Sequence, residues 1–446
     1  MRSAFAGNAP KYNTRGVSRP FQIRAKQRRV GPEGLAVTGC VHRPSLTVPA
    51  VGECRVSLVA VFYLLLGRAR ETEMMPAQAR SNWGNPPWTI DFRPAPAPIP
   101  AEVDFAVVGG GFSGLSAAAW LRRLAPDKSV VLLESGTIGA GSSGRTGGLA
   151  LAETAAGDLP GLGDVLGGFA SILKELDIDC DLALPGVYEI GRTEALPDSP
   201  ISWSDSGTLR AAKQVPGGTI DAGKMLSGLG RAAEKSGARI FESLPVEAIE
   251  FGECVRLLHP RGQIRARKAL LATNALSLQL SGLASRGESK FTLVVATGPL
   301  SESQVESLGL ASGRPFYTID FPYLWGRTLR TGGVMFGGGL VHVKDWRELC
   351  SLNVEEGESA RLIERLEARV RGLHPVLKDA RLAHRWGGPI LIAHDWTPVF
   401  ARHPQSASAI VLGGFSGHGV AQSVYLGRWA AEALSERRAL PNWDSK

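Results

Sequence analysis

The feature that most constrains this chain is an apolar run followed at once by a glycine loop, DFAVVGGGFSGL, beginning at Asp104. The first five of these residues are typical of a buried parallel strand. The glycines Gly109, Gly111 and Gly114 fill the spacing G-x-G-x-x-G. The first allows a tight turn, the second lets backbone approach a pyrophosphate, and the third lets the next helix pack closely on the strand. Residues 112–124 are predicted to form that helix, whose N-terminus favours an anion.

A second apolar run, SVVLLE, ends in Glu134, which stands 20 residues after Gly114. A carboxylate at this spacing accepts hydrogen bonds from ribose hydroxyls and repels a 2′-phosphate. Strand, loop, helix, strand and acid therefore occur in the order of a dinucleotide site. The alternative is a tight glycine turn with no ligand.

The segment after Glu134 favours FAD over a nicotinamide cofactor. Residues 136–148, GTIGAGSSGRTGG, are too rich in glycine for a helix and are predicted to form a loop beneath a long cofactor. Its backbone amides and the side chains of Ser142, Ser143 and Arg145 are candidates to bond the pyrophosphate and the ribityl chain. A flexible surface loop is the alternative.

Later segments are predicted to rejoin the sheet that starts at Asp104. Residues 221–251 have the pattern of a capped helix, a short strand and a second strand through Val246, and residues 263–275 read as a further strand. Residues 409–434 predict a strand, a glycine turn and a helix. We expect the N-terminus of this last helix to stabilise negative charge on a flavin ring.

The motifs VVGGGFSGLSAAAWL, GAGSSGRTGG, ARKALLATNA, RWGGP and GGFSGHGV occur in this order. Together they resemble the FAD-dependent amine and amino-acid oxidoreductases of the D-amino-acid oxidase superfamily, especially the glycine/sarcosine oxidase and gamma-glutamylputrescine oxidase branch. The resemblance covers residues 85–440 approximately. It implies an α/β fold in which a discontinuous, Rossmann-like FAD-binding domain alternates with a substrate domain built on a large antiparallel sheet.

The resemblance also implies which residues contact FAD. Those that hold the ADP part are Gly109, Gly111, Gly114 and Glu134. Those along the pyrophosphate and flavin are Ser143, Gly144 and Arg145, and Val246 meets the adenine through its backbone. Those at the pyrimidine edge of the flavin are Gly417, His418 and Gly419.

Two departures keep the amine specificity of the polyamine branch from being transferred to this chain. Thr146 stands where that branch tends to have asparagine, and Leu324, Trp325 and Gly326 surround Arg327 where it has tyrosines.

The implied domain segments alternate along the chain. They are an N-terminal extension at 1–90, FAD-binding segments at 91–160, 216–282 and 395–446, and substrate segments at 161–215 and 283–394.

The substrate side offers arginines as candidate catalytic residues. An amino-acid substrate needs a group that holds its carboxylate, and a fixed arginine can bond both oxygens. Arg327 is the first candidate and Arg385 the second, and a structural ion pair is the alternative for either. His418 is a third candidate, with helix capping as its alternative. Three aromatic residues are expected to line the pocket or to belong to the core: Tyr317, Tyr323 and Trp325.

Charge is distributed unevenly. Residues 1–80 carry 13 Lys/Arg and 4 Asp/Glu, a net of +9, so the rest of the chain sums to −1 against the total of +8. The remainder therefore lacks the excess of basic residues that is typical of proteins that bind nucleic acid or anionic membranes. For the extension we consider a start at Met74 or Met75, a disordered or targeting arm, and a signal-like segment. Its apolar run at 56–67 is too short to span a bilayer.

Cysteine and histidine spacing argues against disulfide and metal chemistry. The five cysteines form no C-x-x-C pair, which fits a reducing cytoplasm. His374, His384, His394 and Asp395 lack the spacing of a metal site, so no metal is predicted.

The sequence thus predicts a cytoplasmic, FAD-dependent oxidoreductase. Its substrate is a primary or secondary amine, of an amino acid or N-substituted amino acid, which transfers a hydride to FAD. Oxygen or an electron carrier would reoxidise the flavin. The alternatives are an FAD/NAD(P)H-type reductase or monooxygenase, and a non-catalytic scaffold with the same fold.

Overall fold

The apolar run before the glycine loop forms β1 (Glu102–Val108), which lies inside an eight-stranded sheet in the computed structural model. The structure describes residues 82–443. The other strands on the main path of this sheet are β17 (Val399–His403), β18 (Ser406–Gly413), β11 (Gly262–Leu271), β2 (Val130–Leu133) and β8 (Arg239–Phe241). A hairpin of β9 (Ala248–Phe251) and β10 (Val255–His259) continues from β11.

The centre of this first sheet is parallel. β1 pairs in parallel with β2 and β11, β2 pairs with β8, and β11 pairs with β18. These strands come from three stretches that are far apart in the sequence. The prediction that later segments rejoin the sheet is therefore confirmed.

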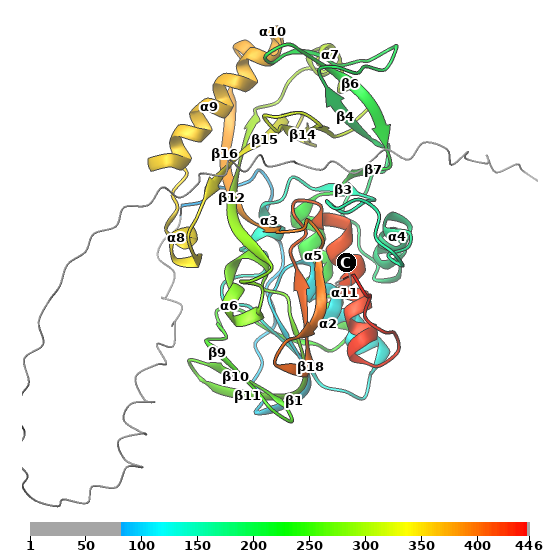
Figure 1. Cartoon of the computed structure of the whole chain (residues 1–446), viewed down its shortest axis with the longest axis vertical. Helices are drawn as coiled ribbons and strands as arrows, with labels where there is room; N and C mark the ends of the chain where they lie inside the picture. The colour runs from blue at the N-terminus through cyan, green and yellow to red at the C-terminus, as the bar shows by residue number, and fades with distance from the viewer. Residues whose placement is uncertain (1–81, 444–446) are drawn as a thin grey trace, which may run out of the picture. The chain divides into compact units, whose positions relative to one another are not determined.

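Helices cover one face of the first sheet because their apolar residues form one core with it (Figure 1). They are α2 (Phe112–Leu124), α4 (Val165–Glu175), α5 (Ala222–Lys235) and α11 (Gly419–Leu434). α2 and α11 pack closely at Gly427, where a Cβ would lie 2.6 Å from the Ser113 carbonyl oxygen.

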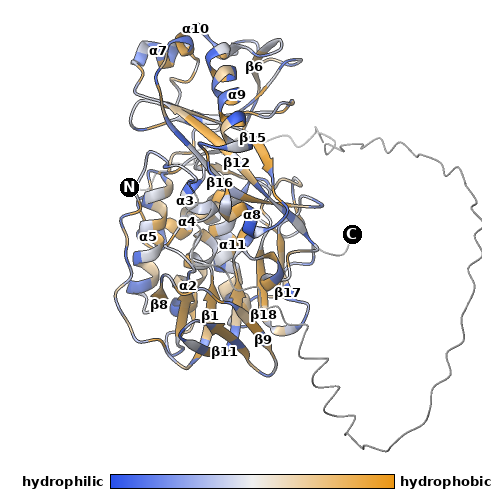
Figure 2. Ribbon diagram, turned by 90° about the vertical axis from the view of Figure 1, so that its left-hand side faces the viewer, coloured by the Kyte–Doolittle hydropathy of each residue, from blue (hydrophilic) through white to orange (hydrophobic). Residues whose placement is uncertain are grey.

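A second eight-stranded sheet is mainly antiparallel, with β13 and β4 as a parallel pair. In spatial order its strands are β16 (Leu382–Ala393), β12 (Gly287–Thr297), β15 (Val334–His342), β14 (Trp325–Thr328), β13 (Phe316–Thr318), β4 (Val187–Gly191), β6 (Thr208–Val215) and β5 (Ser202–Ser204). α9 (Gly357–Leu373) packs on this sheet through Ile363, Leu366 and Val370. Figure 2 shows the concentration of hydrophobic residues in the strands of both sheets.

The remaining elements are short. They are the pair β3 (Leu149–Leu151) and β7 (Gly217–Thr219), and α3 (Ser142–Arg145), η1 (Asn274–Leu276), α6 (Leu278–Ser281), α7 (Glu302–Ser307), α8 (Trp346–Ser351) and α10 (Pro375–Lys378). No helix within residues 82–443 is both long enough and apolar enough to cross a membrane.

The N-terminal extension predicted at 1–90 does not reach that far, because residues 82–90 pack into the fold. Trp83 is buried in the core of the second sheet, and its indole N–H donates to the Leu349 carbonyl at 3.2 Å. Trp88 donates to the Gly144 carbonyl at 2.8 Å. The candidate start sites and the apolar run at 56–67 lie outside the described residues.

The predicted α/β fold is confirmed, and two details of it are wrong. The glycine-rich segment 136–148 contains one helical turn, α3, because Gly144 lets it approach the Gly139 carbonyl oxygen, 2.1 Å from where a Cβ would lie. The strand predicted through Val246 begins only at Ala248, since Leu244 instead bonds the Glu134 carbonyl. The predicted boundaries between the interior domain segments stay predictions.

Candidate active site

The glycine loop after β1 depends on close backbone contacts. Gly109 has a φ of +112°, and a Cβ on it would lie 2.5 Å from the Ala272 carbonyl oxygen. A Cβ on Gly114 would lie 1.9 Å from the Gly109 carbonyl oxygen. Neither position tolerates a side chain without movement of the backbone. The roles that the sequence predicts for the first and third glycines therefore match the geometry.

The start of α2 presents free backbone donors. Among the described residues, the N–H groups of Gly111, Ser113 and Gly114 have no hydrogen-bond partner, whereas Phe112 N–H donates to Ser143 Oγ at 3.1 Å. The positive end of a helix with unpaired N–H groups is suited to a phosphate. Ser143 is thus fixed against this site.

Glu134 lies directly after β2 and next to the glycine loop. Its Oε2 accepts from Gly110 N–H at 2.7 Å and its Oε1 from Gly136 N–H at 2.8 Å. Oε1 also accepts from Ser135 Oγ at 3.2 Å, so Oε2 is the oxygen that keeps a further lone pair for a ribose hydroxyl. Burial raises the pKa of Glu134, although both backbone donors oppose that shift.

Val246 offers a free backbone edge close to Glu134. The two are linked through Leu244, whose N–H donates to the Glu134 carbonyl at 2.9 Å. The side chain of Val246 is buried, while its own N–H and C=O have no partner within the described part of the chain. A free donor and acceptor side by side suit the edge of an adenine ring, as the sequence resemblance implies.

Arg145 uses its guanidinium for the protein's own backbone. Its Nη1 donates to the carbonyls of Gly84 at 2.8 Å, Trp83 at 3.2 Å and Gly387 at 3.3 Å. It also lies over the Trp83 ring, 5.3 Å from its centroid, and burial lowers its pKa to about 10. Arg145 therefore fastens the N-terminal segment to β16, and its predicted contact with the cofactor stays a prediction.

The turn between β18 and α11 contains the residues predicted at the flavin edge. Gly417 is exposed with a φ of +92°, and His418 stands at the N-cap position of α11. The His418 side chain makes no capping hydrogen bond, and burial lowers its pKa. The first N–H groups of α11, beginning at Gly419, have no backbone partner among the described residues. This turn therefore lies at the positive, N-terminal end of a 16-residue helix, where negative charge is favoured.

One face of the second sheet is turned toward the end of the 136–148 loop. Trp325 and Arg327 are two residues apart on β14, so both point to this face. The Trp325 ring covers Gly147, where a Cβ would lie 2.1 Å from it. Arg327 Nε donates to the Gly147 carbonyl at 2.6 Å. Tyr317 pairs with Trp325 from β13 and belongs to the same face.

Arg327 is a buried cation with donors to spare. Its residue is 6% exposed, and its Nη atoms have no hydrogen-bond or ion-pair partner among residues 82–443. Burial lowers its pKa to about 10, while the negative charges of Asp221 and Asp181 oppose this shift. The side chain is fixed at Nε and free at its terminal nitrogens.

Arg385, the second candidate, is already paired. Its Nε and Nη2 bond the two carboxylate oxygens of Glu367 at 2.5 and 3.0 Å, and Glu367 raises the pKa of Arg385. The pair is formed with α9, on the side of the sheet away from the loop. The structure thus favours the ion-pair alternative for Arg385.

The chain matches the model of the family described as "FAD dependent oxidoreductase" over residues 104–433. That range contains the glycine loop, Glu134, Arg327 and the His418 turn. The chain belongs to the FAD-dependent oxidoreductase family. The match confirms the predicted enzyme class and FAD as the cofactor, and the relatives described next confirm the predicted resemblance.

Relatives of this FAD-dependent oxidoreductase align with most of its length. A gamma-glutamylputrescine oxidoreductase of Escherichia coli (strain K12) is 27% identical over 375 residues, 74% of this chain and 83% of that protein. The sarcosine oxidase subunit beta of Rhizobium meliloti (strain 1021) is 23% identical over 358 residues, 72% of this chain and 81% of that protein. The crystal structure of glycine oxidase from Geobacillus kaustophilus aligns with a TM-score of 0.60 and 18% identity, over 76% of this chain and 96% of that one.

The residues present fit FAD. The unpaired N–H groups at α2 suit its pyrophosphate, Glu134 suits a ribose, and the free backbone of Val246 suits the adenine. The unpaired N–H groups at the start of α11 suit an electron-rich ring edge. Within the described residues, no cluster of three His, Cys, Asp or Glu side chains could hold a metal ion.

Asn274 is a site-building residue that sequence reasoning missed. Its Nδ2 donates to Ser142 Oγ at 3.2 Å and its Oδ1 accepts from Gly414 N–H at 3.1 Å. It has a φ of +47°, a region that asparagine tolerates better than most residues. Asn274 thus joins the 136–148 loop to the end of β18. The sequence pattern predicts Asn274 inside a strand at 263–275, whereas β11 ends at Leu271 and Asn274 begins η1, so no local signal marked this residue.

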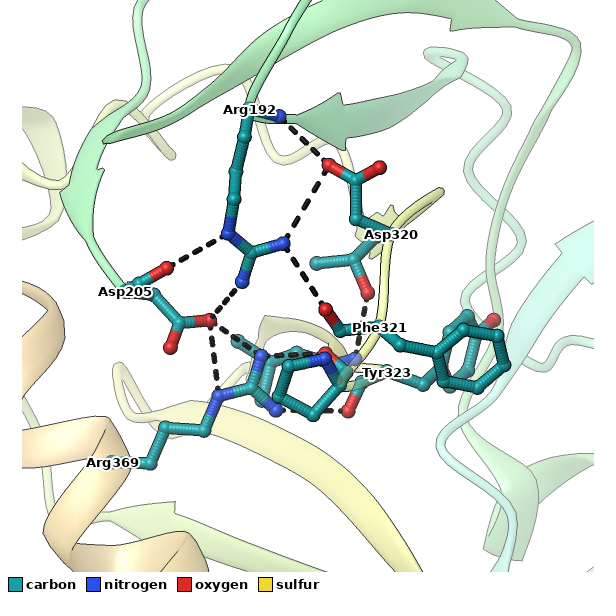
Figure 3. A network of polar contacts seen from close by, with 9 residues as sticks. Arg192, Asp205, Asp320, Phe321, Tyr323 and Arg369 are labelled. Atoms are coloured by element: carbon teal, nitrogen blue, oxygen red, sulfur yellow. Dashed lines mark hydrogen bonds and ion pairs between the residues drawn. The ribbon is translucent and has the colours of Figure 1, made fainter. Parts of the chain in front are cut away.

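The loop between β13 and β14 is held by a network of arginines (Figure 3). Asp205 Oδ2 accepts from Arg192 at 3.0 Å and from Arg369 at 2.6 Å. Arg369 also donates to the Tyr323 carbonyl at 3.0 Å. Phe321 is 76% exposed and Tyr323 is 43% exposed. Burial nevertheless raises the pKa of the Tyr323 hydroxyl to about 12, and Tyr323 contributes to the raised pKa of Tyr317, so Tyr323 lies near the face on which Tyr317 and Trp325 stand.

Proposed function

We propose that this FAD-dependent oxidoreductase oxidises the amine of an amino acid or N-substituted amino acid, and that Arg327 holds the substrate carboxylate. The observation that carries this proposal is the buried guanidinium whose terminal donors have no partner within residues 82–443. Buried polar groups normally have partners, and a buried charge requires one. A carboxylate supplies two acceptor oxygens in the geometry of the guanidinium fork.

The chemistry of the relatives favours an amine. One relative is named gamma-glutamylputrescine oxidoreductase, another is a sarcosine oxidase subunit, and one structural neighbour is a glycine oxidase. Each name describes an amine or amino acid. We therefore extend to this chain the oxidation of a carbon–nitrogen bond.

The hydrogen bond from Arg327 to the Gly147 carbonyl supports a carboxylate contact beside the 136–148 loop. Gly147 follows closely after Ser143 and Gly144, which are predicted to lie along the cofactor. A substrate held at Arg327 thus has its carboxyl end fixed next to this loop, and Trp325 forms a wall beside it. Such positioning lowers the entropic cost of reaction.

FAD, when bound, accepts the hydride that leaves the substrate carbon next to the nitrogen. The protein orients the substrate and favours negative charge near the start of α11. His418 stays neutral at neutral pH because burial lowers its pKa, so it adds no second positive charge. We propose a role for it in contacting the flavin edge.

Paired substrates test the carboxylate contact. We would screen amino acids, N-methyl amino acids and their decarboxylated amines by anaerobic bleaching of the bound flavin. Arg327→Ala should raise KM for the carboxylate-bearing member by ~10- to 150-fold, since a hydrogen bond to a charged group contributes about 1.5–3 kcal/mol. The amine without a carboxylate should be unaffected, and the protein should stay yellow.

Arg385→Ala discriminates between the two arginine candidates. Because Arg385 is bonded to Glu367 at the surface, its loss should leave KM unchanged. An unchanged KM in Arg327→Ala with a raised KM in Arg385→Ala would transfer the carboxylate contact to Arg385. Unchanged KM values in both variants would refute an arginine contact.

Two further parts of the proposal concern the setting of the reaction. The three described cysteines are free, which supports a reducing compartment, and we propose the cytoplasm. Peroxide release during turnover would identify oxygen as the electron acceptor. Turnover that requires an added electron carrier would identify a dehydrogenase.

A further inference from the structure

A row of side chains leads from Arg327 across the same face of the second sheet. Trp325 on β14 pairs with Tyr317 on β13, and Tyr317 pairs with Glu189 on β4. Paired residues on neighbouring strands share a face. The Tyr317 hydroxyl donates to Glu189 Oε1 at 2.8 Å. The row thus begins with a cation, continues through two aromatic rings and reaches a carboxylate, beyond which Lys213 on β6 pairs with Glu189.

A second carboxylate, Glu153, joins the acidic end of this row. It lies two residues after β3, in the segment that follows the cofactor loop. Glu153 is solvent-exposed, yet desolvation by the surrounding protein and then the negative charges of Glu189 and Asp158 raise the pKa of its carboxyl. Lys213 opposes that shift from β6, but neither Glu153 nor Glu189 forms an ion pair with any of residues 82–443. The acidic end therefore holds two carboxylates against the single ammonium of Lys213, which leaves a net negative charge.

Gln422 independently indicates a missing partner next to Glu153. It is fully buried in the first helical turn of α11, and its Nε2 donates to the Glu153 carbonyl at 2.6 Å. Its Oε1 is buried without any hydrogen-bond partner within the described part. This unpaired buried acceptor, in a side chain bonded to the Glu153 backbone, calls for a group that brings hydrogen-bond donors.

We propose that Glu153 and Glu189 form a subsite for a second, cationic amino group of the substrate, so that the enzyme acts on amino acids with a basic side chain. The proposal rests on the function proposed above, in which Arg327 holds the carboxylate. An ammonium group supplies three donors to the acidic end. Two opposite charges at the two ends of one row fix both ends of a zwitterionic chain.

The spacing of the row suits such a substrate. Arg327 and Glu189 are separated by two strand spacings and about two residues, which places their Cα atoms ~12 Å apart for ordinary sheet dimensions. A second amino group several bonds away from the carboxylate is thus required to contact both ends, and a short amino acid such as glycine fails to do so.

Lysine and norleucine form the matched pair of probes. They have the same chain length, and norleucine lacks the distal ammonium. With the holoenzyme, both enantiomers and their N-methyl forms are compared by the rate of anaerobic flavin bleaching. We expect kcat/KM for the lysine form to exceed that for the norleucine form by about tenfold to a hundredfold.

Variants test whether Glu153 and Glu189 cause the preference for lysine over norleucine. Glu153→Gln and Glu189→Gln should each bring the two rates closer together, mainly through KM for the lysine form. Glu189→Lys should reverse the preference. Glu364→Gln makes the same change on an exposed position of α9, and should leave the ratio unchanged.

The outcomes separate the subsite from the function on which it rests. Equal rates for lysine and norleucine in the unmodified enzyme would overturn the subsite and leave the amino-acid function standing. A lysine preference that persists in both glutamine variants would overturn it as well. The absence of bleaching by every amino acid, in a protein that stays yellow, would overturn the proposed function together with the subsite.

Discussion

Replacement of Gly114 by alanine tests whether backbone contact at the glycine loop controls cofactor binding. A Cβ at this position would lie 1.9 Å from the Gly109 carbonyl oxygen and 3.2 Å from a Val107 methyl. To remove the first overlap, the loop and α2 must move apart by roughly 1 Å, because the close-packed interior leaves no free space for the methyl group. A shift of this size takes an ordinary N–H···O distance beyond hydrogen-bonding range.

FAD affinity should fall because this shift moves the backbone N–H groups at the start of α2. If two of the unpaired N–H groups at the start of α2 lose a charged phosphate, at about 1.5 kcal/mol or more each, FAD binds at least ~100-fold more weakly. Stability changes less, because overpacking costs about 1–3 kcal/mol and alanine returns nearly 1 kcal/mol of helix propensity.

Titration of apoprotein with FAD, followed by flavin fluorescence, measures the dissociation constant. Gly372→Ala is the matched control, because Gly372 also lies in a helix and a Cβ there meets no atom within 4 Å. It should leave FAD affinity unchanged. Equal FAD affinity in Gly114→Ala and the unmodified protein would refute the reasoning.

Two further predictions concern stability. Trp83→Ala should cost about 3–5 kcal/mol of unfolding free energy in urea, because it removes a buried ring and its hydrogen bond, whereas Trp396→Ala removes an exposed ring and should cost little. Equal losses in the two variants would contradict the packing of Trp83. Burial lowers the pKa of His418, so between its folded pKa and about 6.5 only the unfolded chain binds the proton. Stability should therefore fall as the pH drops from about 7 to 5, less steeply in His418→Gln, and identical pH slopes would contradict this assignment.

The cofactor half of the site was predictable from sequence because its signals are local. Gly109, Gly114 and Glu134 act through spacing along one continuous strand–loop–helix–strand unit, and the geometry of such a unit follows from chain connectivity. Their backbone contacts match the predicted roles. The resemblance to a known family extended these local signals to the segments that follow.

The substrate half was decided by tertiary contacts. Arg327 and Arg385 have similar sequence surroundings in strands, yet one is buried against Gly147 and the other is paired with Glu367 on α9. Strand parity assigns a face only after the strand bounds and partners are known. The sequence could therefore name both arginines as candidates, but only the structure showed that Arg385 is paired and that the terminal nitrogens of Arg327 have no partner among residues 82–443.

The sequence by itself determined the fold class, the family and the cofactor, since strand patterns, glycine spacing and one acid act over short separations. Only the tertiary structure decided that Trp83 belongs to the core, that Asn274 joins two remote loops, and that Glu189 accepts a hydrogen bond from Tyr317, which pairs with Trp325. Each of these depends on residues tens to hundreds of positions apart. Such pairs leave no periodic signal in a single sequence, because the chain brings them together only when the sheets and helices pack.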